Sequence, residues 1–230
     1  MNILITGASG FIGQHLLKAC LDHSHQVTAC VRDTAQVQRY YPRAQVIQCD
    51  FAKDNDICVW LPRLTNIDVV INAVGIIQQR GTNTFDALHT HTPCALFKAC
   101  EIRHVSKVIQ ISALGADDTA FSQYHLSKKT ADDFLSSLDL DWTILMPSLV
   151  YGPGAKSLRL FKAMAALPVT PLVCKGEQLI QPIHISDLSN ALLALIENPT
   201  IRQRRIEAVG PKAVTLRQLY VVLKHWFGYT

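Results

Sequence analysis

The chain has 230 residues, of which 49% are apolar and 17% charged, and its formal net charge at pH 7 is +4. A chain of this length can bury one sizeable core and is short for two independent cores. Its basic residues are scattered except for a short cluster at Arg202, Arg204 and Arg205, so we expect no nucleic-acid partner.

The seven cysteines are odd in number, and none of them forms a C-x-x-C pair. No apolar run reaches the roughly 18 residues that a membrane span needs, and Met1 leads directly into an apolar strand. We therefore predict a cytoplasmic protein with reduced cysteines, no metal site and no membrane span. The residues before Thr230 offer no obvious finishing element, which leaves a longer natural chain open.

Short apolar runs rich in β-branched residues alternate with amphipathic stretches along the first two thirds of the chain. The predicted strands are Ile3–Thr6, Val27–Val31, Val46–Cys49, Val69–Val74, Val108–Ser112 and Trp142–Met146. Between them, apolar residues keep a helical period near residues 12–20, 85–100 and 126–138. This alternation predicts an α/β fold of the Rossmann type, a doubly wound parallel sheet covered by helices on both faces.

The pattern changes after Pro147, where proline and glycine become frequent and helical stretches are expected near residues 156–166, 186–197 and 215–227. We predict a Rossmann core over residues 1–150. Residues 151–230 are predicted to form a small C-terminal substrate-side lobe that is interleaved with the core.

The first strand runs directly into a glycine-rich turn and then into a helix. Gly7 permits a tight turn, Gly10 lets the backbone approach a pyrophosphate, and Gly13 allows a helix to pack closely on a strand. A turn that merely links strand to helix is the alternative, but the N-terminal strand context favours dinucleotide binding. The predicted phosphate-binding residues are Gly7, Ser9, Gly10, Phe11, Ile12 and Gly13.

Several further segments join this G-x-x-G-x-x-G turn in one family resemblance. They are Cys49-Asp50-Phe51, Asn72-Ala73-Val74-Gly75, Tyr124-His125-Leu126-Ser127-Lys128 and residues 146–154. Together they resemble the extended and atypical short-chain dehydrogenases/reductases, of the NAD-dependent epimerase/dehydratase type, from residue 1 to about residue 190. Residues 85–100, 111–117 and 181–187 resemble the atypical branch that includes an accessory subunit of respiratory complex I. That branch contains both enzymes and proteins that only hold a nucleotide.

The resemblance implies a nicotinamide dinucleotide as cofactor, with Asp50 and the backbone of Phe51 at the adenine. It places Ala73, Val74, Gly75, Ser112 and Pro147 along the rest of the cofactor. The second strand ends at Val31 and is followed by Arg32 in place of a carboxylate, which favours the 2′-phosphate of NADP. NAD stays open, because Arg32 could be a solvated strand-end residue and Asp33 would accept the ribose hydroxyls if the register shifts by two.

Tyr124 and Lys128 are four residues apart and share one face of a predicted helix. The resemblance makes them the proton-transfer pair, in which the ammonium lowers the pKa of the phenol and donates to the nicotinamide ribose. Leu114 stands where the family carries a Ser or Thr, and Ser112 is two residues early.

Three functions follow from these residues. The first is an NADP-dependent oxidoreductase acting on a carbonyl compound or an alcohol. The second is a nucleotide-holding structural, assembly or regulatory protein. The third, a sugar-nucleotide epimerase or dehydratase, needs a larger lobe than the chain provides. The expected partners are a small-molecule substrate and either a second copy of the chain or a larger complex.

Two histidine pairs and one helix start complete the sequence predictions. His23 with His25, and His89 with His91, have no neighbouring ligand set for a metal, and we interpret them as surface or capping residues. Asp187 or Ser186 is predicted to cap the helix near residues 186–197.

Overall fold

A seven-stranded parallel sheet forms the centre of the protein in the computed structural model, which describes residues 1–155, 161, 163–167, 172–226 and 228. Its strands are β1 (Asn2–Thr6), β2 (Gln26–Val31), β3 (Gln45–Gln48), β4 (Val69–Asn72), β5 (Lys107–Ile111), β6 (Trp142–Pro147) and β10 (Arg204–Ala208). Their order is β10-β6-β5-β4-β1-β2-β3, and every pair is parallel. The predicted Rossmann-type fold and its six strands are confirmed.

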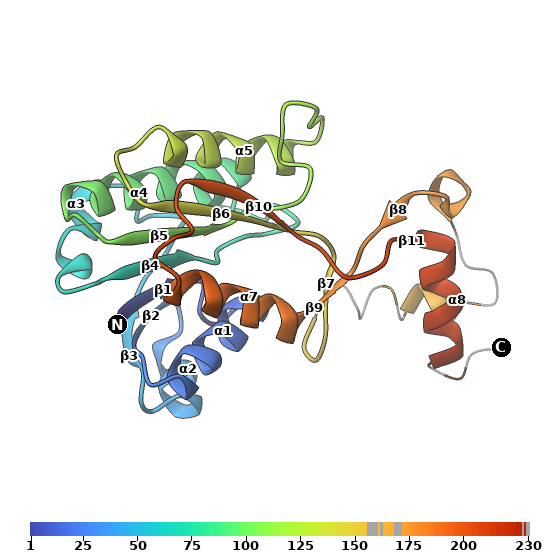
Figure 1. Ribbon diagram of the computed structural model, residues 1–230, viewed down its shortest axis with the longest axis horizontal. Helices are drawn as coiled ribbons and strands as arrows, with labels where there is room; N and C mark the ends of the chain where they lie inside the picture. Colours follow the sequence, from blue (N-terminus) through green and yellow to red (C-terminus); the bar gives the residue numbers. More distant parts are fainter. Residues whose placement is uncertain (156–160, 162, 168–171, 227, 229–230) are drawn as a thin grey trace.

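Helices cover both faces of this sheet (Figure 1). One face carries α1 (Phe11–Asp22), α2 (Thr34–Tyr40) and α7 (Ile185–Glu197), and the other carries α3 (Ile57–Trp60), α4 (Thr92–Ile102) and α5 (Gln123–Ser136). Short turns of helix, η1 (Pro62–Leu64) and η2 (Asp86–His91), precede β4 and α4. Each face has its own buried apolar cluster, because strands enclosed between two helical layers bury their side chains in both directions.

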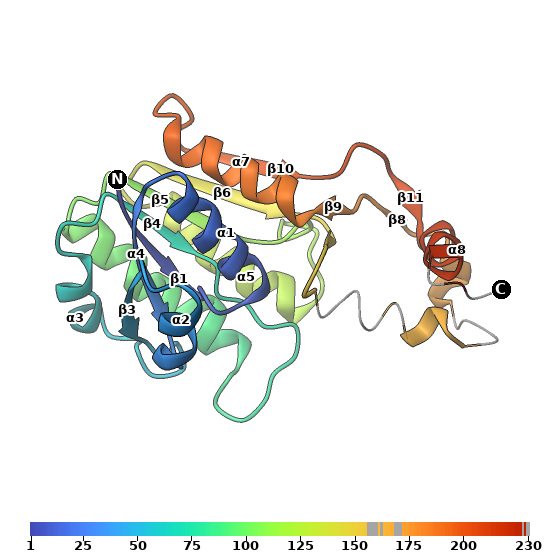
Figure 2. The ribbon, with the colours of Figure 1, turned by 90° about the horizontal axis from the view of Figure 1, so that it is seen from below.

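The lobe stands off the carboxyl edge of the sheet in both views (Figures 1 and 2). It contains β8 (Leu179–Ile180), β11 (Val214–Thr215), η3 (Val173–Gly176) and α8 (Leu216–Trp226), and its small core is built on Ala165, Tyr220 and Leu223. The strands β7 (Val150–Tyr151) and β9 (Ile183–His184) pair at its base. The helix expected near residues 156–166 lies largely outside the described residues.

The chain returns from the lobe to the core. α7 packs on α1 and buries Leu188, Leu192 and Ile196, and β10 adds the last strand beside β6. Residues 151–230 are therefore shared between the lobe and the core. Among the described residues, no helix has the length and apolar character to cross a membrane.

The start of α7 corrects one prediction. His184 is its N-cap residue, and its Nδ1 accepts a hydrogen bond from Ser186 N at 3.3 Å. The expected caps, Ser186 and Asp187, lie inside the helix instead. An imidazole nitrogen can accept from the first turn as a carboxylate oxygen does, so His184 takes the position before them.

Candidate functional site

The glycine turn brings three backbone segments into contact. Gly7 has φ +69°, and a Cβ there would lie 2.8 Å from Ala73 O at the end of β4. A Cβ on Gly13 would lie 2.1 Å from Gly7 O, which is far inside van der Waals contact. Only glycine fits at these two positions, so the turn and the end of β4 meet backbone to backbone.

The N-terminus of α1 opens beside this turn. Gly10 is its N-cap residue, and within the described chain no side chain caps this end. Ser9 and Gly10 are exposed, while Phe11 and Ile12 are half-buried. Uncapped N–H groups and the positive end of the helix dipole favour an anion, so this glycine cradle fits the pyrophosphate of a dinucleotide.

The ends of β2 and β3 hold the residues that we predicted at the adenosine. Arg32 is exposed directly after β2. Asp33 is the N-cap of α2 and accepts from Gln36 N at 3.2 Å. Asp50 accepts from Ala52 N at 3.1 Å, next to the buried Phe51. Because Asp33 is engaged in capping, Arg32 is the freer side chain to meet a cofactor at this edge.

The turn after β4, residues 73–75, is bound by Lys128. Its Nζ donates to Val74 O at 3.2 Å and to Ile111 O at 2.9 Å, and the side chain is only 3% exposed. Burial lowers the pKa of Lys128 to about 8. The predicted glycine turn, the β4 turn and Lys128 are thus brought together at the carboxyl edge of the sheet.

Tyr124 lies one helical turn before Lys128 on α5. Its ring meets those of Phe85 and His89 edge to face, at centroid distances of 5.9 and 5.4 Å. The expected lowering of the phenol pKa is wrong for this geometry: burial raises the pKa of Tyr124, and the nearby Asp132 carboxylate raises it further. Lys128 donates to two backbone carbonyls and is not among the charges that shift the Tyr124 pKa.

Ser112 is turned toward the protein interior. Its hydroxyl donates to Asp132 Oδ2, and Asp132 is fully buried, with its pKa raised to about 6 by that burial. Leu114 N donates to Pro147 O at 3.0 Å, so these two loop segments are tied through their backbones. Leu114 therefore has no hydroxyl where the resemblance predicted one near a substrate. The hydroxyl of Ser112 is engaged with Asp132.

A buried polar row crosses the strand ends and was missed from the sequence. Thr6 Oγ1 donates to Asn72 Oδ1 at 2.6 Å, and Asn72 Nδ2 donates to Gln110 Oε1 at 2.7 Å. Polar residues in otherwise apolar strands could have signalled it. Asp132 was also missed, although it continues the Tyr124 and Lys128 face at the next i+4 position.

His89 corrects the interpretation of the second histidine pair. Its side chain is 1% exposed and stacks on Phe85 at 5.2 Å, whereas His91 is exposed. The signal available from the sequence was its place four residues after Phe85, on the apolar face of the expected helix.

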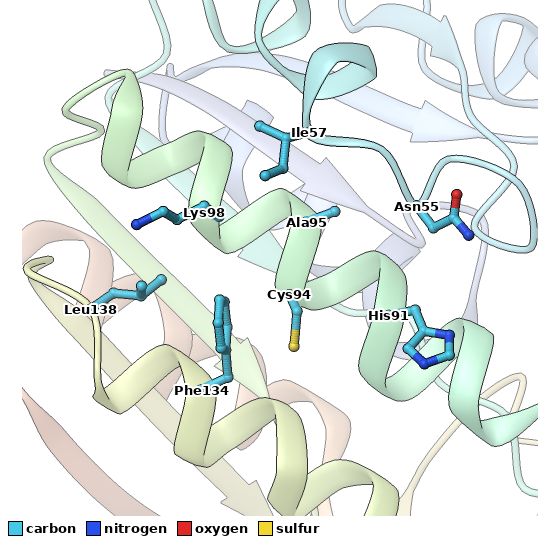
Figure 3. Close-up of a pocket in the computed structure, with 8 residues that line it drawn as sticks. All are labelled: Asn55, Ile57, His91, Cys94, Ala95, Lys98, Phe134 and Leu138. Carbon is cyan, nitrogen blue, oxygen red and sulfur yellow. The ribbon is translucent and has the colours of Figure 1, made fainter.

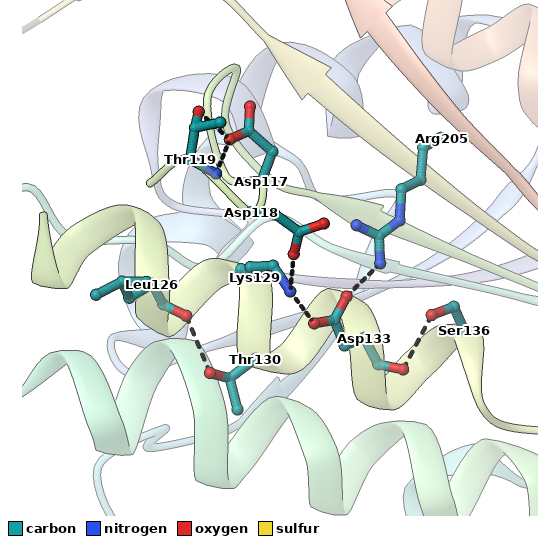
Figure 4. Close-up of polar contacts among 9 residues, drawn as sticks. All are labelled: Asp117, Asp118, Thr119, Leu126, Lys129, Thr130, Asp133, Ser136 and Arg205. Carbon is teal, nitrogen blue, oxygen red and sulfur yellow. Dashed lines mark hydrogen bonds and ion pairs between the residues drawn. The ribbon is translucent and has the colours of Figure 1, made fainter. Parts of the chain in front are cut away.

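Two other features surround the site without sharing its residues. A groove of about 490 Å³ lies on the outer side of α4 and α5 (Figure 3); its lining includes His91, Cys94 and Phe134. An ion-pair chain links the loop after β5 to α5 and β10 (Figure 4). Lys129 Nζ lies 3.0 Å from Asp118 Oδ1, and Asp133 binds both Lys129 and Arg205.

Comparisons with known proteins agree with this geometry. A family model described as NAD(P)H-binding matches residues 7–164, more than half of the chain. A ceramide reductase of Caulobacter vibrioides (strain NA1000 / CB15N) is 27% identical over 229 residues, which are 98% of this chain and 70% of that protein. Mitochondrial NADH dehydrogenase (ubiquinone) 1 alpha subcomplex subunit 9 of Rattus norvegicus is 25% identical; the match covers 98% of this chain and 60% of that one.

The fold is also shared with solved structures. A UDP-glucuronic acid 4-epimerase from Bacillus cereus, in complex with UDP-glucuronic acid and NAD, superposes with a TM-score of 0.81 at 23% identity. The match covers 100% of this chain and 84% of that one, and at this identity the likeness concerns the fold. From the family match and the glycine cradle we conclude that the chain belongs to the NAD(P)H-binding family and carries an NAD(P)-binding Rossmann domain.

Proposed function

We propose that the protein is an NADP(H)-dependent oxidoreductase that reduces a small-molecule carbonyl compound to an alcohol. The observation that carries this proposal is the binding of the turn after β4 by Lys128, which lies one helical turn after Tyr124 on α5; this turn itself touches Gly7 of the glycine cradle. We assign Tyr124 as the proton donor at the nicotinamide end of the cofactor.

The reduced nicotinamide, when bound, supplies the hydride that the carbonyl carbon accepts. The phenol of Tyr124 gives its proton to the carbonyl oxygen, so that C=O becomes CH–OH. The phenol of Tyr124, whose pKa burial raises further above neutrality, carries at neutral pH the proton that reduction requires. Lys128, one helical turn away, holds the turn after β4 through Val74 O.

The preference for NADP(H) rests on the end of β2. Arg32 follows this strand as an exposed cation, and a guanidinium binds a phosphate well. Asp33, which would serve NAD(H), is engaged as the cap of α2. The likeness to a ceramide reductase supports reduction as the direction of the chemistry.

A second candidate function is cofactor holding without turnover. Leu114 has no hydroxyl to bind a substrate oxygen, and the hydroxyl of Ser112 is engaged with Asp132. The similarity to a subunit of NADH dehydrogenase supports this alternative. Tyr124 and Lys128 favour the oxidoreductase, because holding a nucleotide does not require a proton donor.

Turnover of Tyr124→Phe separates the two candidates. Wild type is assayed for NADPH oxidation with a panel of ketones, aldehydes and quinones, and NADPH affinity is measured by fluorescence. Loss of general acid catalysis should lower kcat by about 100-fold or more, while the NADPH Kd stays within about threefold because the hydroxyl is not a principal cofactor contact. Tyr40→Phe, an exposed tyrosine on α2, is the matched control. If wild type binds NADPH tightly but turns over none of these substrates, the result would instead favour the cofactor-holding function.

The cofactor preference has its own test. Arg32→Ala should weaken NADPH about tenfold, equivalent to about 1.4 kcal/mol, and leave NADH within about twofold, because only NADPH carries the 2′-phosphate. Arg39→Ala, an exposed arginine on α2, should change neither affinity. Equal losses for both cofactors would contradict the assignment of Arg32 to the 2′-phosphate.

A further inference from the structure

His89 lies in an unusual stretch of helix. η2 is a π-helical turn over Asp86–His91, and Pro93 follows at the start of α4. Proline has no N–H to donate to the carbonyl of residue 89, and its ring would clash with that carbonyl in a regular α-helix. The wider π turn avoids the clash and presents His89 inward; such turns are frequent at functional sites.

The hydrogen bonds of His89 define its protonation state. Its Nε2 receives the backbone N–H of Ile76 at 3.0 Å, and a backbone N–H can only donate. The proton of the neutral ring is therefore on Nδ1, which lies 3.0 Å from Ser127 Oγ and donates to it. Ser127 Oγ in turn donates to Tyr124 O at 2.9 Å. A directed chain runs from the β4 turn through His89 to the backbone of Tyr124.

Lys128 and His89 hold the same turn from its two sides. Lys128 Nζ binds Val74 O, and His89 Nε2 binds the N–H of Ile76, so the residues flanking Gly75 are both fixed. A Cβ on Gly75 would lie 3.3 Å from Lys128 Nζ and 3.8 Å from His89 Nε2. A side chain at this position would therefore be in ordinary contact with His89 and would require Lys128 Nζ to shift by a few tenths of an ångström.

The imidazole ring of His89 also makes apolar contacts that few other residue types could make while keeping both hydrogen bonds. It stacks on Phe85 and meets Tyr124 edge to face, while its two nitrogens point to partners on opposite sides. Burial, and the charge of Lys128 nearby, lower its pKa to about 3, so the ring stays neutral. Asparagine reaches only one of the two partners, and phenylalanine reaches neither.

We infer that His89, as the neutral Nδ1–H tautomer, is a positioning residue that clamps the Val74–Ile76 turn to α5 and so fixes Tyr124 and Lys128 against the cofactor. This inference rests on the proposed function for its purpose, because a proton donor must be held at a fixed distance from the nicotinamide. The clamp itself is a property of the chain and can be measured without turnover.

The tautomer is read by ¹⁵N NMR of the histidine side chains. We expect one imidazole with a protonated Nδ1 and an unprotonated Nε2 whose shifts stay constant from pH 9 to pH 5. Ser127→Ala removes the acceptor of the Nδ1 proton, together with the hydrogen bond to Tyr124 O, and leaves the Ile76 N–H on Nε2; it should therefore move this signal and assign it to His89. A protonated Nε2, or titration of the assigned signal within this range, would overturn the inference.

Hydrogen exchange measures the clamp. His89→Phe retains a ring against Phe85 but leaves the Ile76 N–H without its acceptor, so the Ile76 amide should exchange at least tenfold faster and the NADPH Kd should rise several-fold. His91→Phe, an exposed position two residues away, is the matched control and should change neither. If His89→Phe does not fold, Ser127→Ala tests the inference instead. The measurements are then the shift of the His89 NMR signal and the mobility of the Tyr124 backbone amide.

Equal Ile76 exchange in the two His→Phe variants would overturn the clamp. Failure of the proposed function looks different: wild type would reduce no carbonyl compound, while the tautomer and the exchange rates would still be as expected. Where a substrate is reduced, His89→Phe should lower kcat more than it raises the substrate KM, because it disturbs the proton donor and not the substrate contacts.

Discussion

Gly13→Ala tests the close packing of α1 on the glycine turn. The added Cβ would lie 2.1 Å from Gly7 O, 2.8 Å from Gly7 C and 2.9 Å from Ala8 Cα. All three atoms belong to the backbone, so no side-chain rotation can relieve the contact. Helix and strand must separate by about 1 Å, and this same separation distorts the cradle that binds the pyrophosphate.

The sign of the change in unfolding free energy on Gly13→Ala tests this close packing. Overpacking against rigid atoms costs about 3 kcal/mol, at the upper end of its usual range. Alanine is preferred over glycine within a helix by about 1 kcal/mol, so the net loss is about 2 kcal/mol. In a chain of this size that loss lowers Tm by about 4–8 °C. Without the clash, the variant would be more stable than wild type by about 1 kcal/mol.

Thermal unfolding and NADPH titration together provide the assay. Gly10→Ala is the matched control: its Cβ would meet Gly7 O at 3.1 Å, and alanine at an N-cap costs about 0.5–1 kcal/mol relative to better caps. Both variants should weaken NADPH at least tenfold, because Gly10→Ala adds a methyl group at the phosphate cradle and Gly13→Ala distorts the cradle, but only Gly13→Ala should lose substantial stability. A Gly13→Ala protein as stable as wild type would refute the close approach of α1.

Three further variants test other parts of the structure. Lys107→Met removes a buried ammonium that donates to three carbonyls at 2.9–3.1 Å, and should cost about 3 kcal/mol in urea unfolding, against under 1 kcal/mol for the exposed Lys18→Met; equal effects would contradict this role. Burial raises the pKa of Asp132 from 3.8 to about 6, so the folded protein holds this proton more tightly than the unfolded chain and loses stability as the pH rises from about 4 to 6. At about 1.4 kcal/mol per pH unit, Asp132→Asn should gain about 3 kcal/mol over wild type across that window in pH-dependent unfolding, and a constant difference would exclude this cause. Arg205→Ala breaks a surface ion pair with Asp133 and should cost under about 1 kcal/mol, with the cost shrinking in 1 M salt; a larger, salt-independent loss would indicate a packing role.

The core of the fold could be predicted from the apolar runs of its strands. Strands enclosed between two helical layers are apolar on both faces, so the five inner strands were predictable as apolar runs, and β3, at one edge of the sheet, was predictable from its adjacent Val46 and Ile47. β10 was not, because it is an edge strand with the sequence Arg204-Arg205-Ile206-Glu207-Ala208, and its charged residues are exposed. An edge strand needs only one partner and part of one buried face, which leaves a weak signal.

The site was predictable where chemistry requires one residue type at one spacing. Glycines in the turn, and a tyrosine and a lysine four apart, are of this kind. His89 and Asp132 were missed because their role depends on what packs around them: a backbone N–H, a serine or a ring contributed by another element. The direction of the Tyr124 pKa likewise depends on burial and on the nearby Asp132 carboxylate, and neither can be obtained from the spacing of Tyr124 and Lys128.

The return of the chain from the lobe limits how the protein can be divided. A fragment that stops at residue 150 would lack β10, leave the outer edge of β6 unpaired and uncover the face of α1 that α7 buries. Such a fragment would expose apolar surface and an open strand edge, both of which promote aggregation. The lobe elements fall in two separate stretches of the chain: η3 and β8 precede Gln181, and β11 and α8 follow Gly210, where Gly210 N donates to Gln181 O at 3.2 Å. Because α7 and β10 lie between these two stretches, the lobe cannot be removed as one continuous piece without removing a helix and a strand of the core.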